Sequence, residues 1–523
     1  MSRPSVRATL LPRVALFALL ALSRAAFAQQ PQAQPVVPPP AQPQAQQPII
    51  APDKPLTLDE AVGWALQKNF GLQRQTLTLE NAKETVISAD ADFDPTLTAT
   101  AIRSVNQAAS TTSRLEGTAQ QGPRSDNTTM RVGANQRLEQ TNGTVSVSAN
   151  LTRQATNSTN ALLNPAYGNG ISANLNQPLL RNSGRLNATA VRERAKIALT
   201  ISQHNYKNNV LQLIENVENA YFNVVAARET LRIRQMTQER SQLLVDENTA
   251  RRTSGVATDL DVLTSEVGLA NARRAVIQQE QVVHDAEDAL LNLINVPTFD
   301  ARLGPVAFDD YREGTPNFAQ SYKLARENFP DTLSAQETIR SLEITLAVAR
   351  RNLRPTLNLD ASLGYTARAT SANYQQTIAN LPNDHGNNWN VSLNYSMPWG
   401  KRADRSAFRR ANNDLGSQKI ELDRLEQQLI VLVRGQVRAI ETQVAAVQVQ
   451  SRATELAARQ FEQQKARYDA GLSTSRVVLQ FQEDLENTRL QELNAKLALR
   501  RAVSELRRLE GTSIERFRVQ LPY

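Results

Sequence analysis

An internal repeat constrains the fold of this chain more than any other feature, because two halves of the sequence follow the same order of landmarks. Two glycine pairs mark the repeat, and the members of each pair lie 216 positions apart: Gly184 and Gly400, Gly255 and Gly471. Two copies of one unit bury their apolar faces against each other. We therefore expect residues 56–300 and residues 301–511 to fold into the same succession of elements, followed by a tail at 512–523.

Each repeat holds a stretch suited to one long helix. No glycine or proline occurs between Gly184 and Gly255, and no proline occurs between Pro398 and Pro522. Apolar residues recur in both stretches at spacings of three and four, as in a coiled coil: Val210, Ile214, Val217, Tyr221 and Val224 in the first, and Leu422, Leu425, Leu429, Val433, Val437, Ile440, Val444 and Val447 in the second. The predicted helices cover residues 187–252 and 402–468, about 100 Å each.

Shorter helices precede the strands and follow the long helices. The first begins at Thr57, with Glu60 three residues later in a capping box, and continues to about residue 91. The other three are predicted at 317–352, 257–295 and 473–510. Two short helices placed end to end match one long helix in length. This arithmetic predicts a long helix packed along a composite partner, in a rod that starts at the strands.

Strands are predicted between the helices of each repeat. Alternating apolar and polar residues indicate strands at 95–107 and 170–178 in the first repeat, and at 355–366 and 388–398 in the second. The first repeat also holds a segment that the second lacks. It alternates from residue 129 to residue 153 around the dipeptide Asn142-Gly143, which is typical of a β-hairpin.

The segment WNVSLNYSMPWG, residues 389–400, indicates where such strands lie. One side of the extended chain carries Trp389, Val391, Leu393, Tyr395 and Met397, and the other carries asparagine and serine. Trp389 and Trp399 are separated by about 33 Å of strand, which rises about 25 Å when tilted as in an outer-membrane barrel. We therefore expect Trp389, Tyr395 and Trp399 to be membrane-interface aromatics.

The N-terminal segment is typical of an exported protein. Residues 1–28 combine arginines, an apolar stretch and Ala26-Phe27-Ala28, as in a signal peptide. Residues 29–55 are rich in proline and glutamine, as in an extended linker. The chain has no cysteine, which fits an oxidising compartment. No later stretch reaches the length of an apolar membrane helix, so a membrane-spanning part would be a closed barrel.

Other functional classes find little support. The net charge of +8 falls to about +4 once the four arginines of the signal peptide are removed, and the basic residues are dispersed, so we expect no nucleic-acid partner. His204, His284 and His385 are far apart and form no metal-ligand motif. We find no nucleotide loop, nucleophile motif or cofactor fingerprint. The chain is therefore expected to be neither an enzyme nor a cofactor or metal protein.

From Leu56 to about Gly511 the chain resembles the TolC family of outer-membrane efflux proteins. The resemblance rests on the twofold repeat, on LTLDEAVGWALQKN at its start, on QPLLRNSGR after the first strands, and on two glycine turns, ARRTSGVATDLDVL and ARYDAGLSTSRVVL. It implies an α+β membrane protein. It also implies assembly as a trimer. Two strand pairs from each of the three chains then form a shared twelve-stranded transmembrane β-barrel, and coiled-coil helices form a tunnel through the periplasm.

The resemblance also implies a role and partners. The trimer is a passive export channel for small molecules or proteins, in efflux or type I secretion, and receives cargo from an inner-membrane RND or ABC pump through a periplasmic adaptor (membrane fusion) protein. The family pattern places the adaptor contact at the helix turns: Arg251, Gly255, Asp261, Val262, Leu263, Arg467, Tyr468, Gly471, Val478 and Leu479.

Several alternatives stay open from the sequence. The extra hairpin either widens the barrel, or lies outside it or in the lumen. Val477 and Gln480 stand where the family can carry acidic gate residues, so an acidic gate is in doubt. The cargo, the pump and the adaptor are not identified. A secreted coiled-coil spacer with a small soluble sheet is the competing hypothesis.

Overall fold

A computed structural model describes residues 55–109, 122–295, 303–306, 314–369, 373–382 and 385–523. The expected signal peptide and nearly all of the expected linker lie outside these residues. The chain divides into two compact units. The sheet unit comprises the described residues of Ser88–Val191 and Ala347–Arg409, and the helical unit comprises those of 55–87, Arg192–Leu346 and Arg410–Tyr523.

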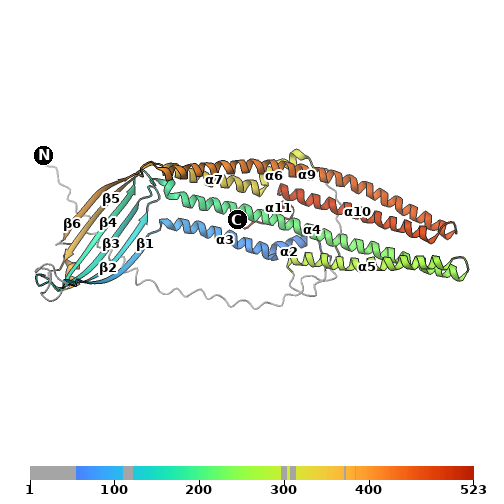
Figure 1. Ribbon diagram of the computed structural model, residues 1–523, viewed down its shortest axis with the longest axis horizontal. Helices are drawn as coiled ribbons and strands as arrows, with labels where there is room; N and C mark the ends of the chain where they lie inside the picture. The colour runs from blue at the N-terminus through green and yellow to red at the C-terminus, as the bar shows by residue number, and fades with distance from the viewer. Residues whose placement is uncertain (1–54, 110–121, 296–302, 307–313, 370–372, 383–384) are drawn as a thin grey trace, which may run out of the picture. The chain divides into compact units, whose positions relative to one another are not determined.

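The sheet unit is one six-stranded antiparallel sheet in which the strands lie side by side in chain order (Figure 1). The strands are β1 (Thr96–Gln107), β2 (Arg124–Arg137), β3 (Thr144–Thr156), β4 (Ala166–Pro178), β5 (Thr356–Arg368) and β6 (Gly386–Ser396). The extra hairpin is β2–β3, which pairs with β1 on one side and with β4 on the other. The hairpin is therefore an insertion within the sheet. Strands β1 and β6 form its two edges.

The loop of this hairpin ends in the Asn142-Gly143 dipeptide, directly before β3. Asn142 adopts a φ of 63°, a left-handed conformation that asparagine tolerates better than most residues. Its side chain accepts a hydrogen bond from Arg137 Nε at 2.8 Å. Residues 138–143 connect β2 to β3, so the hairpin predicted at Asn142-Gly143 is present, but its loop is longer than the two residues of the turn signal.

The helical unit contains the two long helices and their shorter partners. The long helices α4 (Arg185–Thr253) and α9 (Arg402–Asp469) begin in the sheet unit and continue through the helical unit. The shorter helices are α2 (Leu58–Lys68), α3 (Phe70–Asp90), α5 (Asp259–Ile294), α6 (Phe318–Asn328), α7 (Pro330–Arg351) and α10 (Ser475–Glu510). Three short elements complete the described chain: η1 (Ala91–Phe93), α8 (Tyr374–Asn380) and α11 (Ser513–Arg516).

The helix that precedes the strands is interrupted once in each repeat, where the sequence predicted one continuous helix. The first break is at Asn69, whose backbone is extended, with ψ of 122°, and whose side chain accepts a hydrogen bond from Leu72 N. The second break is at Phe329, with ψ of 115°. Pro330 follows directly, and a residue before proline is driven out of the helical region.

At each break, which we call a joint, the helix that precedes the strands meets the end of the helix that follows the long helix. At the first joint, Asn69 Nδ2 donates to Leu293 O near the end of α5, and Asn295 Nδ2 donates to Lys68 O, both at 3.0 Å. At the second joint, Gly511, the residue after α10, packs against Asn328 at the end of α6. A Cβ at Gly511 would lie 2.9 Å from the Cβ of Asn328. The end-to-end arrangement predicted from helix lengths is therefore confirmed in the helical unit.

Apolar seams hold the long helices against these composite partners. The predicted seam of α4 is buried from Val210 to Val224 and packs against α2 and the end of α5. In the second repeat, Leu429, Val433, Val437 and Ile440 of α9 pack against α6 and α10. Leu244 of α4 also contacts a cluster from α9 and α10. The capping box between Thr57 and Glu60 is present in both directions, each bond at 3.2 Å.

Candidate functional site

The two faces of the sheet differ in chemistry along its whole width. One register row crosses all six strands and is apolar throughout: Leu97, Ala134, Val147, Ala173, Leu363 and Trp389. The adjacent row faces the other side and carries only small or polar residues: Thr98, Gly133, Ser148, Ser172, Gly364 and Asn388. Since side chains alternate along each strand, the sheet has one apolar and one polar face.

The described residues leave most of the apolar face uncovered. The exposed fraction is 67% for Leu97, 47% for Val147 and 75% for Trp389. Among the described elements, the short helix α8 packs on one end of this face, where Asn169 Nδ2 donates to Thr377 O at 3.0 Å. A bare apolar face of this width indicates contact with lipid or another protein.

The polar face carries Asp360 on β5, the strand next to the edge strand β6. Its carboxylate accepts hydrogen bonds from Asn176 of β4 and from Asn394 of β6, the latter at 2.7 Å. Threonine, serine and asparagine side chains around Asp360 line a shallow hollow of about 190 Å³. Amides and hydroxyls of this kind interact well with water.

The three aromatic residues expected at membrane interfaces lie in β6 and beyond its end. Trp389 and Tyr395 are on the apolar face, with exposed fractions of 75% and 61%. Trp399 falls in the turn that follows β6, because the strand ends at Ser396, and its side chain is 98% exposed. The apolar stretch between Trp389 and Trp399 is therefore part strand and part turn.

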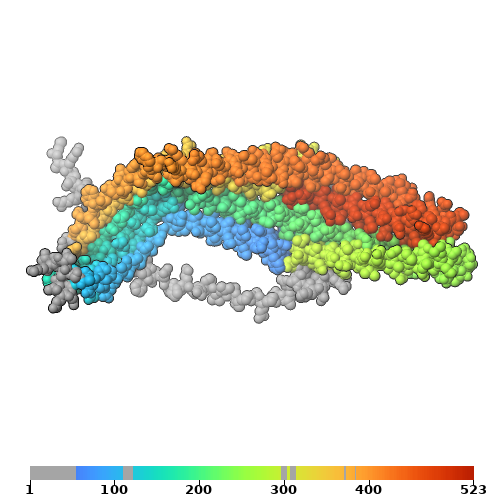
Figure 2. All heavy atoms as spheres, in the orientation of Figure 1, coloured from blue at the N-terminus to red at the C-terminus, as the bar shows by residue number. Residues whose placement is uncertain are grey.

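At one end of the helical unit, two glycine turns reverse the chain, one from α4 into α5 and one from α9 into α10 (Figure 1), and Figure 2 shows the atoms of the two helix pairs side by side there. Gly255 and Gly471 have φ of +71° and +74°, a left-handed conformation that suits glycine. Val256 N bonds to Arg251 O at 2.9 Å, and Leu472 N bonds to Arg467 O at 2.8 Å. Both long helices thus end in the same glycine motif. We call these two turns the first tip and the second tip.

Arg251 of the first tip holds the second tip. Its guanidinium carbon lies 4.1 Å from the centroid of the Tyr468 ring, and its NH1 donates to Tyr468 O at 3.0 Å. A longer ion pair of 3.5 Å joins Arg251 to Asp469. The Tyr468 hydroxyl donates in return to Asn248 Oδ1, so this contact runs in both directions between α4 and α9.

Asp261 caps α5 and also reaches the second tip. Its carboxylate accepts from Thr258 N at 3.1 Å and from Thr258 Oγ1 at 2.7 Å, while its other oxygen accepts from Ser475 Oγ of α10 at 3.1 Å. The hydroxyl and the amide of Thr258 hold the pKa of Asp261 below its usual value, and Ser475 adds to the effect. Asp261 is therefore an ionised cap that links the tips.

The second tip lacks the equivalent cap. Thr474 occupies the N-cap position of α10 but its side chain makes no capping hydrogen bond. Val477 stands three residues later, where Asp261 stands in the first tip, and a valine cannot accept a hydrogen bond. The repeat is thus chemically asymmetric at its tips.

The remaining predicted tip residues separate into buried and exposed groups. Val262, Tyr468 and Val478 have exposed fractions of 6%, 4% and 4%, so their side chains pack inside the tips. Leu479 is half-buried and packs over Gly268. Leu263 and Arg467 face outward.

Exposed apolar residues gather at the tips, and of these the sequence predicted only Leu263. Val256, Leu260 and Leu472 have exposed fractions of 77%, 70% and 71%, and Leu263 lies near them in sequence at 56%. The signal was weak, because Leu260 and Leu263 are only three residues apart in α5 and Val256 lies in the turn before the helix. We call Val256, Leu260, Leu263 and Leu472 the exposed tip group.

A half-buried ionic cluster joins α4 to α10. Arg508 Nε lies 2.7 Å from Glu215 Oε2, and Arg508 NH2 lies 2.6 Å from Glu505 Oε1. Burial raises the pKa of Glu215 to about 7, and the neighbouring Glu505 adds to the increase while Arg508 opposes it. Burial also raises the pKa of Glu218, one turn further along α4.

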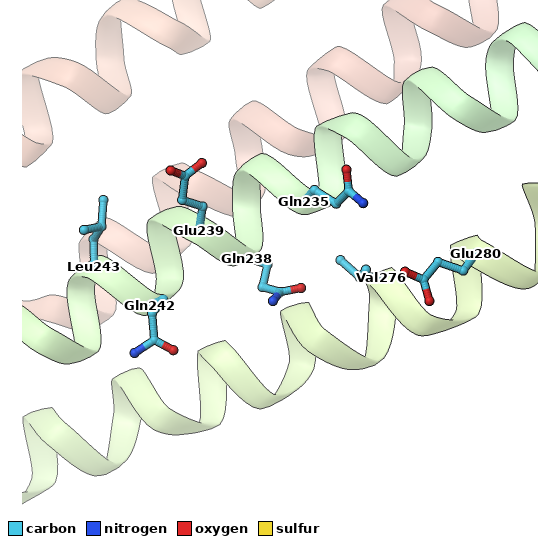
Figure 3. A pocket seen from close by; sticks show the side chains of 7 residues that line it. All are labelled: Gln235, Gln238, Glu239, Gln242, Leu243, Val276 and Glu280. Carbon is cyan, nitrogen blue, oxygen red and sulfur yellow. The ribbon is translucent and has the colours of Figure 1, made fainter. Parts of the chain in front are cut away.

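The groove between α4 and α5 is open and polar. Figure 3 shows Gln238 and Gln242 of α4 directed into the space beside Val276 of α5, with a volume of about 520 Å³. Among the described residues, no group of three or more histidine, cysteine or acidic side chains is arranged to hold a metal ion. The described helices include none that is long and apolar enough to cross a membrane.

A sheet with one bare apolar and one polar face, together with paired long helices that end in glycine tips, defines the class of outer-membrane channel proteins. The outer membrane efflux protein family model matches residues 140–296 and 321–512, about two thirds of the sequence. The chain belongs to this family. Membership of this family places the protein in the outer membrane, a location that differs from that of a secreted spacer.

Known proteins support this assignment to different extents. The pyoverdine export outer membrane protein OpmQ of Pseudomonas aeruginosa is 28% identical over 185 residues, which are 35% of this chain and 39% of that protein. OpmQ of Pseudomonas putida is 28% identical over 180 residues, 34% of this chain and 37% of that protein. The match thus spans about two fifths of these curated relatives.

Solved structures show the same fold over most of the chain. The CmeC outer membrane channel of Campylobacter jejuni aligns with a TM-score of 0.62 at 16% identity, covering 87% of this chain and 85% of that one. The MtrE outer membrane channel of Neisseria gonorrhoeae aligns with a TM-score of 0.61 at 17% identity, covering 90% and 97%. The expected TolC-like fold is therefore confirmed.

Proposed function

We propose that three copies of this chain form a passive export channel, in which the joined sheets make a barrel across the outer membrane and the helices make a periplasmic tunnel. The observation that carries the proposal is the continuous apolar face of the sheet. It crosses all six strands and stays exposed in the single chain. Trp389, Tyr395 and Trp399 then act as aromatic anchors at the membrane interfaces.

The free edges of the sheet support closure by other copies. Among the described strands, β1 and β6 each pair on one side only, and nearly all of their residues are exposed. Unpaired backbone groups cannot face hydrocarbon, so a membrane sheet must close on itself. Six strands are too few for a barrel, whose smallest form has about eight. β6 of one copy therefore pairs with β1 of the next, antiparallel as in the rest of the sheet.

Exposed apolar residues on the helices favour the same assembly. Ile420, Val431 and Val449 of α9 have exposed fractions of 70%, 64% and 66%. Their spacings of 11 and 18 residues equal about three and five helical turns, so they share one face. α3 exposes Phe70 and Leu77, at 69% and 60%. Such unpartnered stripes are typical of helices that pack against another subunit.

The tips are proposed to receive the adaptor. The exposed tip group offers an apolar contact, and the exposed Arg467 and Gly471 lie beside it in the second tip. Arg251, Asp261 and Tyr468 hold the two tips together and shape this surface rather than contact the partner directly. In this proposal the adaptor bridges to an RND or ABC pump in the inner membrane, which supplies the energy.

The cargo is proposed to be a small molecule. OpmQ, which matches part of this chain, is described as a pyoverdine export protein. In this proposal the polar face, with its threonine, serine and asparagine residues, lines the water-filled channel. Its side chains do not favour one cargo over another, so the pump selects the cargo. No step of the proposed function needs a cofactor.

In-cell cross-linking of an affinity-tagged copy, followed by mass spectrometry, tests this function. We expect a homotrimer in the outer membrane that carries an adaptor and a proton-driven pump. An ABC transporter in place of that pump would redirect the proposal toward protein or peptide secretion. A monomer that fractionates away from the outer membrane and carries no adaptor would refute it.

A further inference from the structure

The geometry of the hairpin β2–β3 points to an enlarged membrane barrel. We propose that both hairpin strands stand in the barrel wall, so that three chains of six strands close an eighteen-stranded barrel instead of the twelve-stranded barrel that the family resemblance implies. This inference rests on the proposed trimeric channel. It concerns the width of the channel, which the family assignment does not give.

The hairpin strands carry the same two faces as their neighbours. On the apolar face, Val132 of β2 and Ala149 of β3 continue the row that runs from Ala99 of β1 to Ile171 of β4. On the polar face, Ser148 of β3 lies beside Ser172 of β4, with 3.1 Å between their hydroxyl oxygens. A hairpin that lay in the lumen would be polar on both sides, because water would surround it there. An apolar band in register with the other strands is what a lipid-facing position needs.

Backbone pairing argues against any position outside the wall. β2 pairs with β1 from Asn135 opposite Thr96 to Arg124 opposite Gln107, along the full length of β1. β3 pairs with β4 from Thr144 opposite Asn176 to Gln154 opposite Ala166. Removing the hairpin from the sheet would break both of these ladders, and unpaired backbone groups are strongly unfavourable in the membrane. The hairpin also adds two strands, which keeps the number even and lets every pair stay antiparallel.

The consequence is a wider passage through the outer membrane. Barrel diameter grows roughly linearly with strand number, so eighteen strands give a barrel about half again as wide as twelve. Barrels of 16–18 strands leave an aqueous channel, whereas the smallest barrels are filled by their own side chains. The helical tunnel gains no helix from the hairpin, because the added residues fall between β1 and β4. The extra width is therefore confined to the barrel.

Lipid accessibility of single cysteines tests the position of the hairpin. The chain has no cysteine, so each variant carries a single label. V147C on the apolar face of β3 is matched with S148C on the polar face of the same strand. V391C and N390C are the corresponding pair on β6, outside the hairpin. Each purified full-length variant is labelled with a thiol-reactive fluorophore and reconstituted in vesicles that contain brominated phosphatidylcholine.

We expect the bromine to quench V147C and V391C to a similar extent and to leave S148C and N390C bright. Quenching of V391C with V147C as bright as S148C would place the hairpin outside the wall and overturn this inference, while the proposed channel would stand. No quenching at V391C either would overturn both. An electron cryo-microscopy map of the unmodified trimer decides the same question independently, since it shows eighteen strands or twelve.

Discussion

The guanidinium of Arg251 lies 4.1 Å from the ring centroid of Tyr468, a residue that stands 217 positions later in the chain. The same arginine donates to the Tyr468 carbonyl, and Tyr468 donates its hydroxyl to Asn248, three residues before Arg251. Each tip therefore supplies both a donor and an acceptor to the other. This reciprocal contact fixes the spacing of the two tips within one chain.

Replacing Arg251 by alanine is expected to loosen the tips. The variant loses a partly buried cation–π contact and a charged hydrogen bond, together worth about 1–2 kcal/mol of local stability. Amide hydrogen exchange at the two tips should become faster, with the rest of α4 and α9 unchanged. R252A is the matched control, because Arg252 makes an exposed ion pair with Asp259 that contributes little. Equal exchange in R251A, R252A and the parent chain would contradict this role.

Alanine at the glycine of the second tip should destabilise the protein, whereas alanine at a helical glycine should stabilise it. Gly471 has φ of +74°, and a Cβ there would meet no atom within 4 Å, so the cost of G471A is purely conformational, about 1–2 kcal/mol. Gly435 in the interior of α9 is equally free of close contacts. G435A should therefore gain about 0.5–1 kcal/mol, from the helix propensity of alanine. Thermal unfolding of the two variants checks the opposite signs, and a destabilised G435A would mean that this position is packed in the assembled protein.

Restoring the missing cap at the second tip should stabilise the start of α10. V477D gives Thr474 the acceptor that Asp261 gives Thr258, and such caps contribute about 0.5–2 kcal/mol. Amide exchange in the first turn of α10 should become slower at pH 7. The reverse change, D261V, should accelerate exchange at the start of α5 and also at Ser475, which loses its acceptor. If V477D leaves the first turn of α10 unprotected, the asymmetry of the tips has another origin.

Glu215 should make the stability of the helical unit depend on pH. Its pKa is raised in the folded protein to about 7 from an ordinary value of 4.5. The stability contributed by the protonated form is therefore fully present below pH 4.5 and is lost as the pH rises through about 7. The side chain introduced by E215Q stays neutral at every pH, so the melting temperature of E215Q should fall less between pH 5 and pH 8 than that of the parent chain. E441Q changes an exposed residue of α9 and serves as the control. A melting temperature of E215Q that falls as steeply as that of the parent chain would contradict the prediction.

Periodicity was sufficient to predict the long helices and which strand residues share a face. The seam from Val210 to Val224 is buried as its spacing predicted, because one apolar stripe per long helix leaves one way to pack. The interruption at Phe329 was missed although Pro330 follows it. Proline is accepted in the first turn of a helix, so its presence alone does not distinguish a new helix from a continuous one.

The tips show why a site is harder to predict than an element. The pattern that named Tyr468 and Val478 could not tell that their side chains are buried, because burial there depends on α4 and α10 meeting across more than two hundred residues. The bond from Ser475 to Asp261 likewise joins the two repeats and has no local signal. The position of the hairpin in the sheet also required the register of four strands, which alternation within each strand does not give.

The most direct test of the proposed channel is cross-linking between the two edges of the sheet. A99C in β1 is combined in turn with a cysteine at position 389, 391, 393 or 395 of β6, in the full chain expressed in cells. Within one chain the two edges are separated by five strand spacings, about 24 Å, so a linker shorter than about 10 Å reaches only a neighbouring copy. The account predicts a ladder of outer-membrane species that ends at the trimer for at least one pair. Monomers at all four pairs, or a ladder that continues past the trimer, would contradict it.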